Sequence, residues 1–227
     1  MEGASLGRRA AAEFVGTAFL SLCIIGSGIA ATRLSPGDPG FQLLLNALAT
    51  GLGLAAIILA VGTVSGGQLN PAITLVGYLT KGLAGLAALV YVGAQLAGAA
   101  FGAVVANVTF GLPAVELAER SRSSGELWAS EVVATLGLVL VVFGLLRTGR
   151  SSAVPYAVGA YIAAAILFTS STSFANPAAT IARSLSNTFA GIAPASVPMF
   201  VLAELAGALL GLGAVLLLYP RRGAERR

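Results

Sequence analysis

Two copies of the tripeptide Asn-Pro-Ala are the part of this sequence whose residue types and spacing could do chemistry. Each copy opens an apolar run that is too short to cross a membrane. Asn is a strong N-cap residue and Pro is favoured at the first helical position, so each copy predicts a short half-helix. The cap uses its amide oxygen as an acceptor and leaves its amide NH₂ free to donate to a hydroxyl or water oxygen. The residues are Asn70, Pro71 and Ala72 in the first copy, and Asn176, Pro177 and Ala178 in the second.

An ordinary Asn-Pro turn is the alternative interpretation of a single such motif. Two copies in matching positions favour half-helices, over 70–80 and 176–186, that enter a membrane without crossing it. If their N-terminal ends face one another, each end carries about half a positive charge. That field attracts a neutral hydroxyl oxygen and repels a cation.

The composition places these motifs in a membrane protein. Of the 227 residues, 57% are hydrophobic and 10% are charged, whereas a soluble domain carries about 25% charged residues. The mean hydropathy is +0.91. So few charges exclude a water-exposed globule, a disordered chain and a nucleic-acid binder. Six apolar stretches have the length that a membrane-spanning helix needs, near residues 10–31, 41–64, 86–110, 127–146, 154–170 and 197–219.

The sequence predicts a single transmembrane channel domain, 1–227, built from two related halves over about 8–111 and 126–220. Each half carries three markers in the same order: a Glu in its first span, the Asn-Pro-Ala motif, and a Leu-Ala-Gly-Ala block in its third span. Three spans is an odd number, so the halves must be inverted relative to one another. Inverted repeats place the functional site at the membrane midplane.

The basic residues predict the orientation of the chain. Nine of the thirteen Lys and Arg residues fall on one side of the predicted spans, and the positive-inside rule places both termini there, in the cytoplasm. The linker 112–125 is expected to be a solvated outer loop. The four basic residues on the outer side are Arg33, Arg120, Arg122 and Arg183.

The residue types that are missing limit the chemistry further. The chain has no His and a single Cys, Cys23, which argues against a zinc site, a Ser-His-Asp triad and an internal disulfide. We therefore expect no enzyme activity, no metal and no cofactor. Three acidic residues fall within the spans and need buried partners there, with the role of the third left open: Glu13, Glu131 and Glu204.

Both Asn-Pro-Ala motifs, the Glu residues of the first and fourth spans and the Leu-Ala-Gly-Ala blocks together resemble the aquaporin, or major intrinsic protein, family over nearly the whole chain. The chain looks most like bacterial members with an atypical selectivity filter. The resemblance implies an all-α membrane fold of six spanning helices and two re-entrant half-helices, assembled as a homotetramer with one pore per subunit. It also implies that Asn70 and Asn176 contact the permeant, and that Glu13 and Glu131 hold the re-entrant loops.

The resemblance also locates an outer selectivity filter of four positions. The family spacing gives Thr50, Ala164 (or Ile166, if the fifth span is shifted by two residues), Ser173 and Ala179. Family members usually place an Arg directly after the second Asn-Pro-Ala, where this chain has Ala179, so the ring is expected to be wide and uncharged. Arg183 either lies at the outer vestibule or bonds loop carbonyls.

A wide, uncharged ring suits a passive channel for water and small neutral solutes such as glycerol, urea or a trivalent metalloid like arsenous acid. A strict water channel and a coupled secondary transporter are the alternatives. The expected partners are the lipid bilayer and the solute, and the expected location is the plasma (inner) membrane of a bacterium.

Overall fold

Long runs of apolar residues form the six long helices of the computed structural model, which describes residues 4–220. Six helical segments are long and apolar enough to cross a membrane, the fifth being Ser151–Phe168, in which a 3₁₀ turn extends the fifth long helix, so the six predicted spans are confirmed. The long helices are α1 (Leu6–Leu34), α2 (Pro39–Ser65), α4 (Gly85–Thr109), α5 (Gly125–Arg147), α6 (Val154–Phe168) and α8 (Val197–Leu218).

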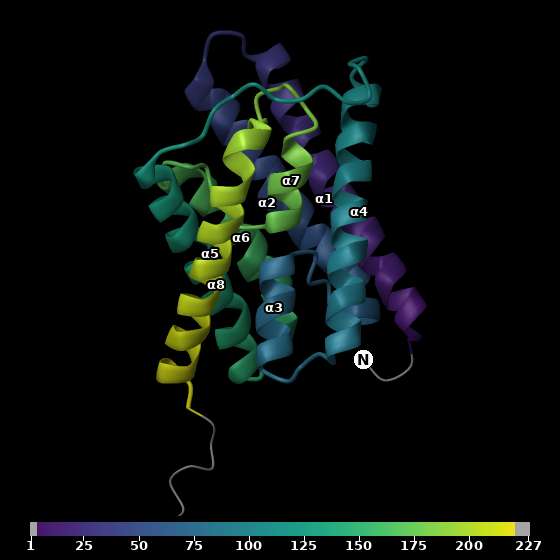
Figure 1. Ribbon diagram of the computed structural model, residues 1–227, viewed down its shortest axis with the longest axis vertical. Coiled ribbons are helices and arrows are strands. Elements are labelled where there is room, and N and C mark those ends of the chain that lie inside the picture. The colour runs from purple at the N-terminus through teal and green to yellow at the C-terminus, as the bar shows by residue number, and fades with distance from the viewer. Residues whose placement is uncertain (1–3, 221–227) are drawn as a thin grey trace, which may run out of the picture.

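Two short helices begin at the prolines of the Asn-Pro-Ala motifs, as predicted. They are α3 (Pro71–Leu79) and α7 (Pro177–Arg183), and the second ends three residues before the predicted boundary. Two single-turn 3₁₀ helices, η1 (Ser151–Ala153) and η2 (Pro194–Ser196), lead into α6 and α8. Figure 1 shows α7 above α3 between the long helices, so the two half-helices approach the middle of the bundle from opposite ends. The described residues form no strand.

Glycines set how closely the long helices pack. A Cβ atom on Gly98 of α4 would collide with the carbonyl oxygen of Phe14 in α1. In the other half, a Cβ atom on Gly207 of α8 would collide with the carbonyl oxygen of Val132 in α5. Backbone-to-backbone contact of this kind is what small residues permit in membrane helices. It brings α1 against α4 and α5 against α8 around the half-helices.

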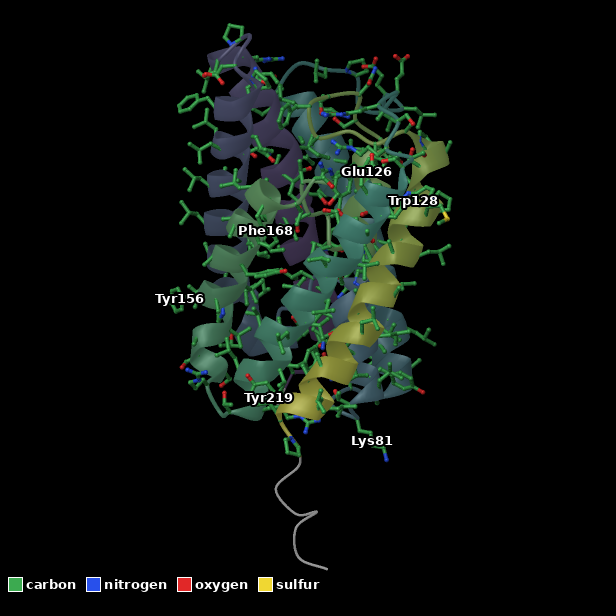
Figure 2. All side chains as sticks on the ribbon, turned by 90° about the vertical axis from the view of Figure 1, so that its left-hand side faces the viewer. Lys81, Glu126, Trp128, Tyr156, Phe168 and Tyr219 are labelled. Atoms are coloured by element: carbon green, nitrogen blue, oxygen red, sulfur yellow. The ribbon has the colours of Figure 1, made fainter. Side chains whose placement is uncertain are left out.

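The start of α1 and the end of α8 lie at the same end of the molecule (Figure 1). Lys81 and Tyr219 lie at that end, and Glu126 and Trp128 lie toward the other (Figure 2). The segment between α4 and α5 crosses the far end of the bundle and pairs with the loop after α7, where Ala118 N–H donates to the carbonyl oxygen of Ser184. The predicted basic tail, including Arg221 and Arg222, lies outside the described residues.

Candidate functional site

Both asparagines of the Asn-Pro-Ala motifs cap their half-helices. The Oδ1 atom of Asn70 accepts the backbone N–H of Ala72 at 2.8 Å. The Oδ1 atom of Asn176 accepts the N–H groups of Ala178 at 3.0 Å and Ala179 at 3.3 Å. The two N-terminal helix ends therefore carry the side-chain caps that Asn-Pro predicts.

The two caps also hold each other's loops. The Nδ2 atom of Asn70 donates to the carbonyl oxygen of Ala175 at 2.7 Å, and the Nδ2 atom of Asn176 donates to the carbonyl oxygen of Leu69 at 2.9 Å. Each amide therefore commits one of its two N–H groups to the opposite loop, which the sequence-based expectation of a wholly free NH₂ missed. One N–H of each amide remains for a ligand.

Glu13 holds the loop that leads into Asn70. Its carboxylate is fully buried and accepts the backbone N–H groups of Gln68 at 3.0 Å and Leu69 at 2.6 Å. It also accepts the Ser65 hydroxyl at 2.6 Å and the Gln95 amide at 2.8 Å. Loop N–H groups inside a membrane need acceptors, and this carboxylate supplies them.

Glu131 makes the corresponding contacts in the second half of the chain. Its two carboxylate oxygens accept the backbone N–H groups of Phe174 at 2.9 Å and Ala175 at 2.8 Å. Thr172 and Ser173, which precede them, adopt left-handed backbone angles with φ of 65° and 43°. Non-glycine residues in this region cost about 1–3 kcal/mol each and persist where the surroundings hold them. The Glu131 carboxylate is part of what holds this loop.

Glu204 is the functional residue whose role the sequence left open. Its Oε1 atom accepts the backbone N–H of Asn176 at 3.1 Å and the Thr180 hydroxyl. Its Oε2 atom is buried without a hydrogen-bond partner in the described chain. Gln95 stands at the matching place in the first half and donates to Glu13 and to Thr74. That correspondence was the only signal in the sequence.

A long cavity of about 1980 Å³ passes the two asparagine caps. Tyr219, at the same end of the molecule as Lys81 (Figure 2), lines it together with Arg147, and Asn46 and Arg183 line it beside the segment that holds Arg120 and Arg122. The passage therefore reaches from one end of the helix bundle toward the other, with Asn70 and Asn176 along its wall.

Four of the five candidate filter residues line this cavity: Thr50, Ile166, Ser173 and Ala179. Ala164 does not line it and is exposed on the outside of α6, so the unshifted register of the fifth span is wrong. Val158 and Ile162 also line the cavity, and Ile166 continues their spacing of four on the same helix face.

The hydroxyl groups of Thr50 and Ser173 are buried and have no hydrogen-bond partner in residues 4–220. Because a buried hydroxyl normally finds a partner, these two, on residues that line the cavity, are groups whose hydrogen bond the described chain does not supply. The lining at this level therefore combines two free hydroxyls with two aliphatic side chains.

Arg183 takes both positions that the sequence left open. Its Nε atom donates to the carbonyl oxygen of Ala190, and its guanidinium lies over the Phe174 ring, 3.3 Å from the ring centroid. Arg183, the last residue of α7, also lines the long cavity. It bonds a loop carbonyl and lies at the mouth.

Arg122 corrects the expectation of a fully solvated outer loop. Its side chain is only 5% exposed and donates to the carbonyl oxygens of Gly191 and Ser171 at 3.1 and 3.3 Å. It faces the Phe174 ring at 4.9 Å from the centroid. Burial, followed by the nearby charge of Arg120, lowers the pKa of Arg122 to about 10. No sequence pattern marks this burial, since it depends on the fold of two distant loops.

Metal binding has no evident location in the described part of the chain. Within residues 4–220, no three His, Cys, Asp or Glu side chains come together as a metal site would require.

Comparisons with known proteins place this architecture in a family. The model of the family described as major intrinsic protein matches residues 1–175. The aquaglyceroporin AqpS of Rhizobium meliloti (strain 1021) is 43% identical over 228 residues, covering 100% of this chain and 97% of that protein. The human lens fiber major intrinsic protein is 34% identical over 176 residues, covering 74% of this chain and 65% of that protein.

A solved structure supports the fold. The X-ray structure of the aquaglyceroporin from Plasmodium falciparum matches with a TM-score of 0.72 at 20% sequence identity, covering 93% of this chain and 96% of that chain. Two capped half-helices that meet inside six spanning helices, together with these matches, show that the chain belongs to the major intrinsic protein family.

Proposed function

We propose that this protein is a passive membrane channel for water and small uncharged solutes, including glycerol, urea and trivalent metalloids such as arsenous acid. The observation that carries the proposal is the uncharged lining at the filter, where Thr50, Ile166, Ser173 and Ala179 surround the passage. The two free hydroxyls can replace part of a solute's hydration, and the two aliphatic side chains accept its apolar face. Such a lining fits polyols and their analogues.

The asparagine caps support selection for neutral solutes. Asn70 and Asn176 each retain one amide N–H beside the cavity, and both belong to the positive ends of half-helices. A hydroxyl or water oxygen accepts from these donors, whereas a cation meets an unfavourable field.

Sequence similarity supports glycerol-sized solutes in particular. The Rhizobium meliloti relative, matched over the full length of this chain, is described as an aquaglyceroporin. Arsenous acid is uncharged at neutral pH and presents three hydroxyl groups, so the lining that accepts glycerol has the donors and width that arsenous acid requires.

We further propose a homotetramer in the inner membrane of a bacterium, with both termini in the cytoplasm. The common end of α1 and α8 supports the placement of the termini (Figure 1). Lys81 and Arg150 follow helices that end there, and Arg147 is the last residue of one of them, as the positive-inside rule requires. Native mass spectrometry of the purified protein tests the subunit number.

The proposed solute range is tested by stopped-flow light scattering on proteoliposomes, with protein-free liposomes as the control. We expect water, glycerol, urea and arsenous acid to equilibrate faster than in the control, with rates that do not respond to a proton or sodium gradient. Permeability to water alone contradicts the wide filter. Flux that follows a gradient indicates a coupled transporter instead.

A further inference from the structure

A second, smaller cavity of about 180 Å³ opens beside the outer mouth of the long passage. Asn46, Thr172 and Arg183 line both cavities, so the two spaces share a wall. Arg120, Arg122 and Phe189 complete the part of the lining that matters here. Three of the four basic residues on the outer side of the membrane therefore surround one small space.

Within residues 4–220, none of these three guanidinium groups forms an ion pair with a carboxylate. Arg120 donates to the carbonyl oxygen of Phe189 at 3.3 Å, Arg122 to those of Gly191 and Ser171, and Arg183 to that of Ala190. Neutral carbonyls orient a guanidinium but leave its charge uncompensated. An arginine has five N–H donors, so each of the three keeps donors that these contacts do not use.

The ring of Phe174 fixes two of the three guanidinium groups. The guanidinium carbon of Arg183 lies 3.3 Å from the ring centroid and that of Arg122 lies 4.9 Å from it. The backbone N–H of Phe174 donates to Glu131, which holds the ring's own residue in place. A guanidinium that presents its face to a ring has its N–H edges left for acceptors in its own plane. The arrangement is preorganised for a planar or tetrahedral group of oxygens.

Guanidinium groups in proteins carry their charge at neutral pH. The pKa of Arg122, lowered by its burial and by Arg120 to about 10, still lies well above 7. Glu131 is the carboxylate whose charge acts most strongly in the opposite direction on Arg122, and it is engaged with the loop N–H groups of Phe174 and Ala175. A net positive cavity at the entrance attracts anions.

We propose that this cavity binds a small oxoanion, of the sulfate and phosphate class, through Arg120, Arg122 and Arg183, and that the bound anion narrows the outer mouth. Oxoanions match the fork of an arginine with two parallel hydrogen bonds. Since Arg183 lines both cavities, an anion held there lies next to the solute path. The effect on flux rests on the proposed channel function, whereas binding itself does not.

The first experiment measures binding without flux. The melting temperature of the purified full-length protein is compared in sodium sulfate and sodium chloride at equal ionic strength. With a dissociation constant of about 1 mM, ~10 mM sulfate is expected to raise Tm by about 3 °C, in a saturable manner. Arg120→Gln, at an exposed position, should abolish the saturable part.

Arg33→Gln is the matched control, because Arg33, like Arg120, is an exposed outer arginine that donates to a backbone carbonyl, in its case that of Phe110. It does not line the small cavity and should keep the full sulfate response. A wild-type protein without a saturable sulfate response, or an Arg120→Gln variant with the same response as wild type, overturns the site.

The second experiment measures glycerol flux into phosphatidylcholine proteoliposomes with sulfate or chloride on both sides, so that channel orientation has no influence. Sulfate at ~10 mM should lower wild-type and Arg33→Gln flux roughly fivefold and leave Arg120→Gln unchanged. A Tm response without this inhibition overturns the narrowing of the mouth. No glycerol flux in chloride, with the Tm response intact, contradicts the proposed function and leaves the anion site established.

A third arm separates the source of the anion. Liposomes that contain phosphatidylglycerol, without added sulfate, reproduce the inhibition only if a lipid headgroup reaches the site. If they do not, the ligand is a free oxoanion.

Discussion

The loop that leads into Asn70 and the loop that leads into Asn176 are each held by one buried carboxylate, but their surroundings differ. In the first loop, the Glu13 carboxylate accepts a hydrogen bond from the neutral amide of Gln95. In the second, Glu131 is accompanied by another carboxylate, Glu204, which accepts the N–H of Asn176 itself. The carboxylate-to-loop hydrogen bonds that both halves share position the asparagines. The halves differ in the neighbouring side chain, which is an amide in the first and a carboxyl group in the second.

The second loop also contributes Ser173 to the cavity lining that we propose as the filter. Ser173 and Ala175 have left-handed backbone angles, and Arg122 and Arg183 lie over Phe174 between them. The first loop has glycine, Gly66 and Gly67, at two of its three positive φ angles, where glycine carries little strain, and Leu69 with φ of 52° at the third. The second loop therefore holds three non-glycine residues at left-handed angles where the first holds one, and it lies beside two arginines.

The largest effect should come from removing either loop-holding carboxylate. Glu13→Ala and Glu131→Ala each leave at least two buried backbone N–H groups without acceptors. The expected loss is at least about 3 kcal/mol, or roughly 6–12 °C in Tm for a chain of this size. Thermal unfolding of the purified variants measures it.

Glu126→Ala is the control for that prediction, since Glu126 is an exposed carboxylate near the start of the same helix as Glu131. It should change Tm by less than about 2 °C. If only one of Glu13→Ala and Glu131→Ala lowers Tm by the expected amount and the other leaves it unchanged, the two loops are not held in the same way.

Exchanging the residues that differ between the halves should have unequal effects. Gln95→Glu replaces a donor 2.8 Å from Glu13 Oε2 with a second carboxylate, and should cost about 3 kcal/mol. Glu204→Gln keeps an oxygen for Asn176 and Thr180 and replaces only the Oε2 atom, which has no hydrogen-bond partner in the described chain, so stability should change by less than about 1 kcal/mol. Thermal unfolding measures both changes. An equal loss of stability in Gln95→Glu and Glu204→Gln would contradict the expectation that the second carboxyl oxygen of Glu204 is not needed for stability.

A smaller effect, on flux rather than folding, should come from the two free hydroxyls, one from each half. Thr50→Val and Ser173→Ala each remove a hydrogen bond to the permeant worth about 1 kcal/mol, which lowers glycerol permeability roughly fivefold. Tm should stay within about 2 °C of wild type. Stopped-flow measurements with glycerol and water check this. Unchanged glycerol permeability in both variants would show that these hydroxyls do not contact the permeant.

Much of the fold followed from the sequence because it depends on local rules. Hydropathy located all six spans, and Asn followed by Pro located both half-helix starts, since capping is decided within a few residues. The fifth span was harder, because counting back from Asn176 does not define which face of the helix points inward. The spacing of Val158, Ile162 and Ile166 would have decided it.

The parts of the site that the sequence did not predict depend on distant contacts. Arg122 is buried because the loop before α5 packs against the loop after α7, and nothing near Arg122 in the sequence encodes that packing. The use of one asparagine N–H by the opposite loop likewise requires both loops to be in place. Local patterns predicted the capped ends but not the bonds between them.

The central claim is a wide filter of small uncharged side chains. Its most direct test compares the same substitution, Ala to Phe, at two different positions. Ala179 lines the passage and Ala164 lies on the outside of α6, so Ala179→Phe fills the ring while Ala164→Phe does not. The ratio of glycerol to water permeability in proteoliposomes should fall about tenfold in Ala179→Phe, equivalent to ~1.4 kcal/mol at the barrier, and stay at the wild-type value in Ala164→Phe. A wild-type protein that passes water but no glycerol, or an Ala179→Phe variant with an unchanged ratio, would contradict it.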